Sequence, residues 1–229
     1  MYTIVCFLAL AWLTIVSLPE IRGIQDINIY TNIGQNVSAF KNGFADELTS
    51  EYPPAISALW YLLAINPLGV SFPLAWISLL IVLFGMMALY TRYRLSETDT
   101  PLFTIALVLS IVLLGNEMIF ARYDILIAIF LFLTWKAHEH RHYADSAGFL
   151  VVASYLKIVP LILLPLLWIL TPRDGRRKLL MGAIVCGIVG AILPMLILGS
   201  SAFLENLQYM IRYHGARGVQ IESTWSSIV

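Results

Sequence analysis

The sequence predicts an all-α, polytopic membrane protein of about seven transmembrane helices, and three observations favour that fold class. Of the 229 residues, 59% are hydrophobic and only 12% are charged, about half the charged share of a soluble globular domain. No charged residue occurs between Tyr52 and Thr91. Apolar runs recur along the chain, at 2–19, 55–66, 71–90, 101–115, 124–135, 146–171 and 179–198. A water-soluble fold of this size needs more charge to cover its surface.

The individual runs differ in length. One crossing takes about 20 residues, and 2–19, 71–90 and 179–198 meet that length. The run 2–19 has no basic region before it and no small-residue cleavage site after it, so we interpret it as a retained membrane helix and not as a cleaved signal. The shorter runs, of roughly 12 residues, need tilt, shielding by neighbours or a thinned bilayer.

The orientation follows from the basic residues, because Lys and Arg collect in the loops on the inner side. They form three groups, of which the last is the densest: Arg92 and Arg94, then Lys136 and Arg141, then Arg173, Arg176, Arg177 and Lys178. All three groups fall inside if the N-terminus is inside, 55–66 lies along the outer surface and 146–171 crosses twice.

In this favoured topology the run 146–171 turns outside near Lys157–Pro160. The outer segments are then 20–70, 116–124, the Lys157 turn and 199–229. In the alternative, 55–66 crosses and 146–171 crosses once, so that 116–124 moves inside while the first loop and the tail stay outside.

Several function classes are excluded by composition. The balance of 14 Lys+Arg against 14 Asp+Glu argues against a nucleic-acid partner, which needs a local excess of basic residues. Cys6 and Cys186 lie in apolar stretches without a CxxC pattern, so no disulfide framework or zinc site is predicted. Gly182, Gly187 and Gly190 lie in an apolar helix, where small residues serve packing.

Three histidines, His138, His140 and His142, alternate beside Arg141. No Cys or carboxylate framework accompanies them, so we interpret them as part of a solvated basic loop and not as metal ligands.

The first outer loop, from Glu20 to Pro54, carries five acids against Arg22 and Lys41. Asp26 and Tyr30 are four residues apart, which puts them on one face of a helix. A carboxylate at the lipid–water boundary is ionised at neutral pH and can take a proton from an acceptor hydroxyl. The competing interpretation is that Asp26 only caps or solvates a juxtamembrane helix.

The loop ends in Glu51-Tyr52-Pro53-Pro54. The prolines fix an extended approach and then allow a helix to begin, since Pro is tolerated in the first turn.

Taken together, these features resemble the GT-C superfamily of membrane glycosyltransferases, and glycosyltransferase family 87 most of all. The resemblance rests on Asp26-x-x-x-Tyr30 and the closing Tyr-Pro-Pro, and on three later stretches. These are Asn116–Asp124 (NEMIFARYD), Ala147-Gly148 through Lys157-Ile158-Val159-Pro160, and Tyr213–Ser223 (YHGARGVQIES). It runs through the whole chain in order and implies one transmembrane domain, 1–229, with 20–54 as its extracytoplasmic catalytic loop and 199–229 as its extracytoplasmic tail.

The resemblance implies an inverting transfer of a hexose, by family likeness mannose, from a polyprenyl-phosphate donor to a lipid or glycan acceptor on the extracytoplasmic side. Asp26 takes the role of general base. The expected substrate-binding residues are Tyr30, Tyr52, Arg122, Lys157, His214, Arg217, Gln220 and Glu222. No obligatory metal is expected, because the first loop lacks the Asp-x-Asp that some relatives carry; a divalent ion stays open.

Each of these residues also has a plain structural interpretation. Arg122 can pair with Asp124 or Glu117, Lys157 can extend from a helix end to the interface, and His214 can be a solvated loop residue. The tyrosines can be ordinary interfacial aromatics.

Relatives usually continue for several more helices, so we expect the chain to be a fragment or to need a partner chain that supplies them. Two other function classes stay open. One is a non-catalytic membrane subunit, for which Asp26 is dispensable. The other is a lipid-linked sugar flippase, which needs ionisable residues lining a path from both sides.

Overall fold

The computed structural model describes residues 25–43, 48, 50–65, 69–90, 93 and 123–216. In chain order its helices are α2 (Gln25–Lys41), α3 (Pro54–Ala64), α4 (Phe72–Tyr90), α6 (Asp124–Glu139), α7 (Tyr143–Leu156), the 3₁₀ helix η2 (Val159–Leu163), α8 (Leu164–Leu170), α9 (Arg173–Leu198) and α10 (Ser200–Ala216). No strand occurs among the described residues, so the all-α prediction is confirmed for them. The predicted helices 2–19 and 101–115 lie outside them.

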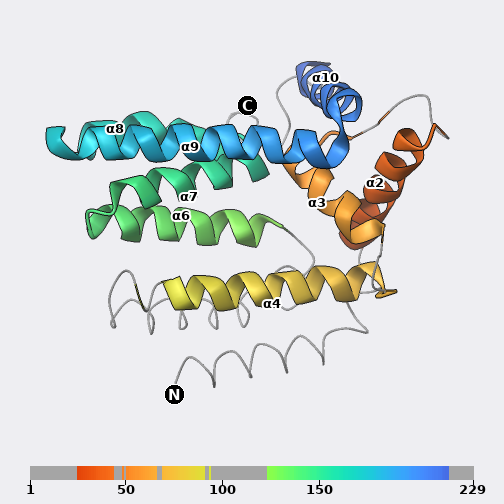
Figure 1. Cartoon of the computed structure of the whole chain (residues 1–229), viewed down its shortest axis with the longest axis horizontal. Helices are drawn as coiled ribbons and strands as arrows, with labels where there is room; N and C mark the ends of the chain where they lie inside the picture. Colours follow the sequence, from red (N-terminus) through yellow and green to blue (C-terminus); the bar gives the residue numbers. More distant parts are fainter. Residues whose placement is uncertain are drawn as a thin grey trace, which may run out of the picture.

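Figure 1 shows two groups of helices. The helices α4, α6, α7 and α9 run along one direction, while α2, α3 and α10 gather at one end of them. The largest core cluster lies between the groups and includes Trp60, Trp76 and Leu126. The core therefore sits where the lengthwise helices meet the end group.

Of the helices described, α9 is the one long and apolar enough to cross a membrane. Only 6% of its most apolar 18-residue window is buried, which leaves an apolar surface of the kind that lipid covers. It follows Pro172 and ends at Gly199, whose φ of 83° favours glycine. The expectation of about seven crossings is therefore not confirmed, and α9 is its best-supported span.

Glycines in α9 allow close packing against α7. A Cβ at Gly182 would overlap the backbone carbonyl oxygen of Ala144, and one at Gly190 would overlap the ring of Tyr155. The predicted packing role is confirmed for these two residues. Gly187 differs, because a Cβ there would meet nothing within 4 Å.

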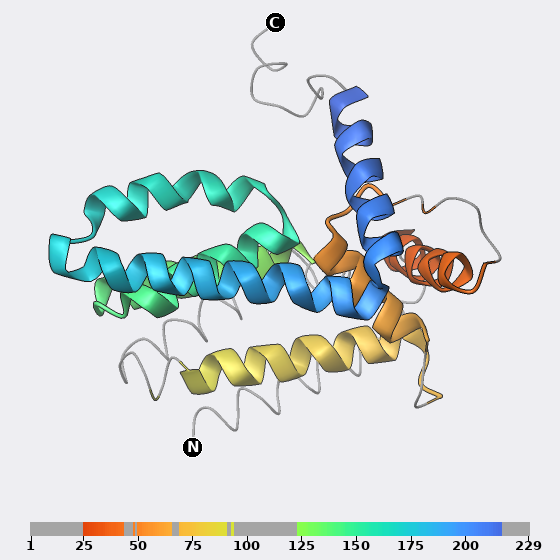
Figure 2. The same cartoon turned by 45° about the horizontal axis from the view of Figure 1, so that its top comes forward.

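A turn at Lys157 divides the predicted run 146–171 into two arms. The helix α7 ends at Leu156, and Lys157 is extended, with φ −153° and ψ 130°. The following η2 and α8 run back along the bundle (Figure 2). The turn that the favoured topology requires is therefore present, whereas its two crossings stay a prediction.

The end group is tied to the lengthwise helices by α2 and α3. The helix α3 begins at Pro54, as the Tyr-Pro-Pro pattern predicts. At the end of α2, Lys41 donates from Nζ to the Ile197 carbonyl of α9 over 2.6 Å and lies 4.4 Å above the Tyr61 ring. Lys41 thus donates to one of the carbonyl groups that have no partner within the helix at the C-terminus of α9.

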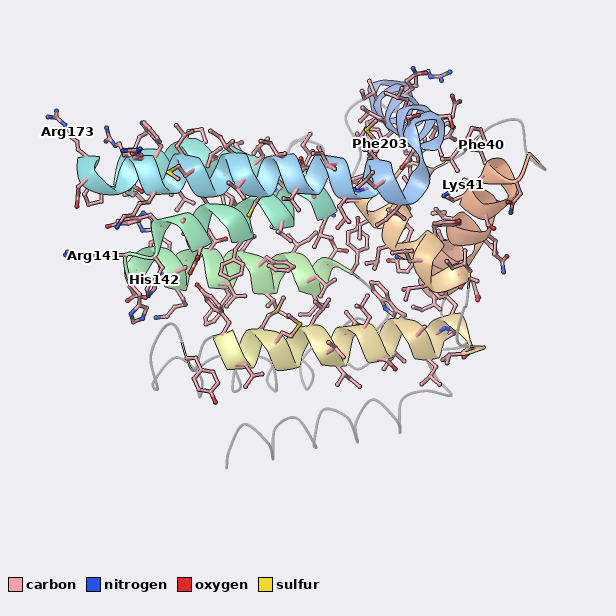
Figure 3. The ribbon with its side chains drawn as sticks, viewed as in Figure 1. Phe40, Lys41, Arg141, His142, Arg173 and Phe203 are labelled. Atoms are coloured by element: carbon pink, nitrogen blue, oxygen red, sulfur yellow. The ribbon has the colours of Figure 1, made fainter. Side chains whose placement is uncertain are left out.

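The two ends of the bundle carry different residues (Figure 3). Arg141, His142 and Arg173 lie at one end, where α6 joins α7 and α9 begins, and Lys41 and Phe203 lie at the other. Arg141, His142 and Arg173 thus share one end of the molecule, away from α2, α3 and α10.

Candidate functional site

Five aromatic side chains form a cluster at the junction of α2, α3, α4 and α6. They are Tyr30, Tyr52, Trp60, Trp76 and Tyr123. Tyr30 stacks on Trp60 with ring centroids 4.2 Å apart and 12° between the planes, and Tyr52 meets Trp60 edge-on at 4.8 Å. Such offset and edge-to-face pairs are favourable beyond the area they bury. The cluster fixes where these helices meet.

Tyr123 keeps the proton of its phenol. Burial holds the pKa of its phenol well above the usual value, and the nearby charges of Asp124 and then of Tyr52 and Glu51 act in the same direction. The phenol therefore stays protonated across the physiological range.

Lys157 and Asp124 form an ion pair beside the aromatic cluster. The ammonium lies 3.0 Å from an Asp124 carboxylate oxygen, and the side chains are 51% and 50% exposed. Asp124 is the first residue of α6 and Lys157 lies in the turn after α7. Both charged groups are thus open to solvent or to a ligand.

The segment that leads into α3 is held by α10. Asn206 donates from Nδ2 to the Ser50 carbonyl over 3.0 Å and to the Tyr52 carbonyl over 3.2 Å. His214 donates from Nε2 to the Glu51 carbonyl over 3.2 Å. Glu51, Tyr52, Asp124, Lys157 and His214 therefore lie around one place, which we call the mouth.

An apolar groove of about 530 Å³ lies beside the mouth, and its lining includes the chain neighbours of two mouth residues, Tyr52 and Lys157. Pro53 and Pro54, next to Tyr52 in the chain, line it, as do Ile158 and Leu161, which follow Lys157. Its remaining walls come from α7, α8, α9 and α10, and include Tyr155, Gly187, Pro194, Phe203, Leu207 and Met210. In its wall the Tyr155 hydroxyl donates to the Gly187 carbonyl over 2.6 Å, which removes two polar groups from the apolar surface.

A smaller hollow of about 270 Å³ lies on α10, lined by Glu205, Tyr209, Arg212 and Tyr213. Arg212 lies 4.0 Å from Glu205, and Tyr209 and Tyr213 have ring centroids 6.2 Å apart. No group of three His, Cys, Asp or Glu side chains that could hold a metal ion occurs among the described residues.

The predicted site residues fall into three sets. Tyr52, Lys157 and His214 come together at the mouth. Tyr30 is only 3% exposed and supports the cluster from behind. Asp26 lies in the first turn of α2, as the helical spacing predicts, but its side chain is outside the described residues, as are Arg122, Arg217, Gln220 and Glu222.

Sequence reasoning missed Asp124, Asn206 and Trp60. Asp124 closes the stretch Asn116–Asp124, yet only Arg122 was singled out there. Asn206 carries a local signal, because it is a polar residue between the apolar Phe203 and Leu207 of one helix. Nothing in the sequence indicates which carbonyl groups its amide binds.

One family model, described as glycosyltransferase family 87, matches residues 51–228. The matched range includes the mouth and the groove, and begins after Asp26 and Tyr30. No curated protein and no solved structure matches the chain.

Proposed function

The chain belongs to glycosyltransferase family 87, and from this premise we propose that it transfers a hexose, most simply mannose, from a polyprenyl-phosphate donor to a lipid or glycan acceptor. The glycosyltransferases of this family are membrane proteins, and α9 is long and apolar enough to span a bilayer. The donor class, the acceptor side and the residue roles are the proposal.

The observation that carries the proposal is that the apolar groove lies beside the mouth. A lipid-linked sugar phosphate has a long apolar chain joined to a charged phosphate and a polar sugar. Its binding calls for an apolar groove that ends beside a cation. Pro53 and Ile158 line the groove, and each is the neighbour in sequence of a mouth residue, Tyr52 and Lys157. A soluble nucleotide sugar has no chain to fill such a groove.

The proposed roles follow from this arrangement. Lys157 exchanges its Asp124 partner for the donor phosphate, and Tyr52 stacks on the sugar. Tyr30 holds the aromatic cluster behind Tyr52 and does not meet the sugar itself. Further contacts to the phosphate and the two sugars come from a last set of candidates: Arg122, His214, Arg217, Gln220 and Glu222.

The proposed chemistry is a single displacement. A carboxylate, for which we propose Asp26, takes the proton of the acceptor hydroxyl while its oxygen bonds to the anomeric carbon. The bond from that carbon to the phosphate oxygen breaks on the opposite face, so the configuration inverts. The electron pair leaves with the lipid phosphate, whose growing charge Lys157 stabilises. The protein's main contribution is to hold the two substrates in line.

We also propose that the mouth faces the extracytoplasmic side. The basic residues Arg173, Arg176, Arg177 and Lys178 begin α9, and such residues favour the inner side. The mouth lies at the other end of α9, with α3 and α10 (Figure 2). The distribution of charge therefore supports an outward-facing mouth.

The test is sugar transfer in membranes that contain the chain, with radiolabelled polyprenyl-phosphate-mannose as donor. The wild type is compared with Asp26→Asn, which is nearly isosteric but cannot act as base. Both are made as the 229-residue chain and as the longest reading frame that contains it. We expect transfer by the wild type and its loss in the variant.

Other outcomes separate the parts of the proposal. Unchanged transfer by Asp26→Asn contradicts the base assignment alone. Transfer from polyprenyl-phosphate-glucose but not from the mannose donor contradicts only the choice of sugar. If folded protein of both lengths transfers from neither lipid donor, the donor class is wrong and a non-catalytic role is favoured.

A further inference from the structure

The helix α10 binds three consecutive backbone carbonyls of the segment before α3. Asn206 contacts the first and third, those of Ser50 and Tyr52, and His214 contacts that of Glu51 between them. Asn206 is fully buried and lies more than 150 residues away in the chain. The hydroxyls of Ser50 and Ser57, 2.8 Å apart, close the other side of the segment.

The orientation of the Asn206 amide follows from its partners. Carbonyl oxygens only accept hydrogen bonds, so Nδ2 must face both of them and Oδ1 must face away. Oδ1 is buried, and no group among the described residues donates a hydrogen bond to it. A buried acceptor without a partner lowers stability, which offsets part of what the two donated hydrogen bonds contribute. The amide is explained if the segment has to be held in one conformation.

The segment that is held forms part of both the mouth and the groove. Tyr52 meets Trp60 and Tyr123 edge-on, at 4.8 Å and 5.9 Å between ring centroids. Pro53 and Pro54, which follow it, line the groove. The carbonyl groups of an extended segment lack the N–H donors that a helix supplies to its own carbonyls. The conformation of this segment therefore depends on donors from other parts of the chain.

We infer that Asn206 is a positioning residue for sugar transfer, because its buried amide holds the carbonyls of Ser50 and Tyr52 and so keeps Tyr52 and the groove wall in place beside Lys157. The expected effect on catalysis rests on the proposed function. The role of Asn206 in holding the segment does not depend on that function. Asn206 acts through the segment and does not contact either substrate.

The holding is tested by electron paramagnetic resonance with a nitroxide at position 51. The label is attached to Glu51→Cys in a full-length chain that carries Cys6→Ala and Cys186→Ala. Asn206→Leu keeps the branched shape of the side chain at a larger volume and removes both donated hydrogen bonds. The matched control is Ala202→Gly, which weakens the same buried face of α10 one turn away and takes no part in the hydrogen bonds to the segment.

We expect a mobile component in the spectrum of Asn206→Leu that is absent from the wild type and from Ala202→Gly. If Asn206→Leu does not fold, Asn206→Ala, which adds no volume, takes its place, and we expect the same mobile component in its spectrum. Spectra of Asn206→Leu or Asn206→Ala that match the wild type overturn the inference. A mobile component in Ala202→Gly of equal size also overturns it, because any weakening of α10 then frees the segment.

Transfer by the unlabelled chain tests the consequence. We expect kcat of Asn206→Leu to fall on the order of ten- to hundredfold, as misplacement of substrate-positioning groups does, while the donor KM changes little and Ala202→Gly keeps its kcat. A freed segment with unchanged kcat overturns the positioning role. A wild type that transfers no sugar overturns the proposed function instead, and the spectra still decide whether Asn206 holds the segment.

Discussion

The Lys157 ammonium lies 3.0 Å from an Asp124 carboxylate oxygen, and this pair joins the turn after α7 to the first residue of α6. Both side chains are about half exposed, at 51% and 50%. Exposed ion pairs of this kind contribute about 0–1 kcal/mol to stability. A pair that matters so little for folding, placed beside an apolar groove, suits a cation that exchanges one anionic partner for another.

Lys157→Met is therefore expected to separate binding from stability. The variant keeps the unbranched side chain and loses the charge, so we expect the KM for a polyprenyl-phosphate donor to rise at least about tenfold, or ~1.4 kcal/mol. The free energy of unfolding in detergent should change by less than about 1 kcal/mol. Donor titrations and thermal unfolding of the same preparations check both values.

The control is the exchanged pair, Lys157→Asp with Asp124→Lys. It restores the attraction between the two elements but moves the cation to α6. We expect the KM to stay high. A normal KM in the exchanged pair means that Lys157 serves only to hold α6 against α7, which contradicts its role in phosphate binding.

Gly187→Leu tests the groove. Gly187 lines the groove, and a Cβ at this position meets nothing within 4 Å, so the leucine side chain begins in open space and occupies part of the groove. We expect transfer from a long-chain donor to fall at least about tenfold, since the displaced chain loses about 0.8 kcal/mol for each CH₂ left unburied. A donor of two isoprene units should be affected much less.

Val189→Leu is the matched control for this substitution. Val189 lies on the same helix, is 55% exposed and is not part of the groove lining. Its enlargement should leave both donors unaffected. If both leucines reduce transfer equally, the loss comes from the apolar surface of α9 in general and the groove is not the binding site of the lipid chain.

Gly182→Ala should destabilise the bundle, although alanine is the better helix former. The added Cβ would overlap the backbone of Ala144, and overpacking against rigid atoms costs about 1–3 kcal/mol. This exceeds the gain of about 1 kcal/mol from replacing a glycine within a helix. Thermal unfolding in detergent should show a lower midpoint for Gly182→Ala and an equal or higher one for Gly187→Ala, where the Cβ has space. Equal shifts in the two variants contradict the close contact of α7 and α9.

Features with a local signal in the sequence could be predicted. Pro53 and Pro54 predicted the start of α3, because the ring of proline fixes φ and suits the first turn of a helix. The spacing of Asp26 and Tyr30 predicted a helix, and α2 contains both. The turn at Lys157 was predicted from the basic residues, because their three groups all fall inside if 55–66 lies along the outer surface and 146–171 crosses twice.

The contacts that make the site could not be predicted in the same way. Asn206 and Ser50 lie 156 residues apart, and helical periodicity does not indicate which carbonyl a buried amide meets. Tyr30 and Tyr52 are equivalent as interfacial aromatics, yet only packing buries the first at 3% exposure and leaves the second half-buried at the mouth. Asp124 acquires its significance only from the turn that brings Lys157 to it.

The side of the membrane that the mouth faces can be decided by labelling single cysteines. We predict that Gln208→Cys, on the exposed face of α10, reacts with a membrane-impermeant maleimide in intact cells. Arg177→Cys, near the start of α9, should react only after the cells are opened. The reason is that Lys and Arg are retained on the inner side, and a helix of 26 residues is longer than the about 20 that a crossing needs. Both variants carry Cys6→Ala and Cys186→Ala, so that each has one thiol.

Each labelling pattern has a distinct meaning for the mouth. The reverse pattern places the mouth on the inner side, where the extracytoplasmic transfer proposed here cannot occur. Labelling of both cysteines in intact cells means that α9 does not cross the membrane. Its exposed apolar side chains must then be buried by protein instead of lipid. The expected pattern requires α9 to cross the membrane and puts Asn206 on the outer side, because α10 follows α9 after the single residue Gly199. Lys157 then lies on the same side, because its neighbour Ile158 and Leu207 of α10 line one groove.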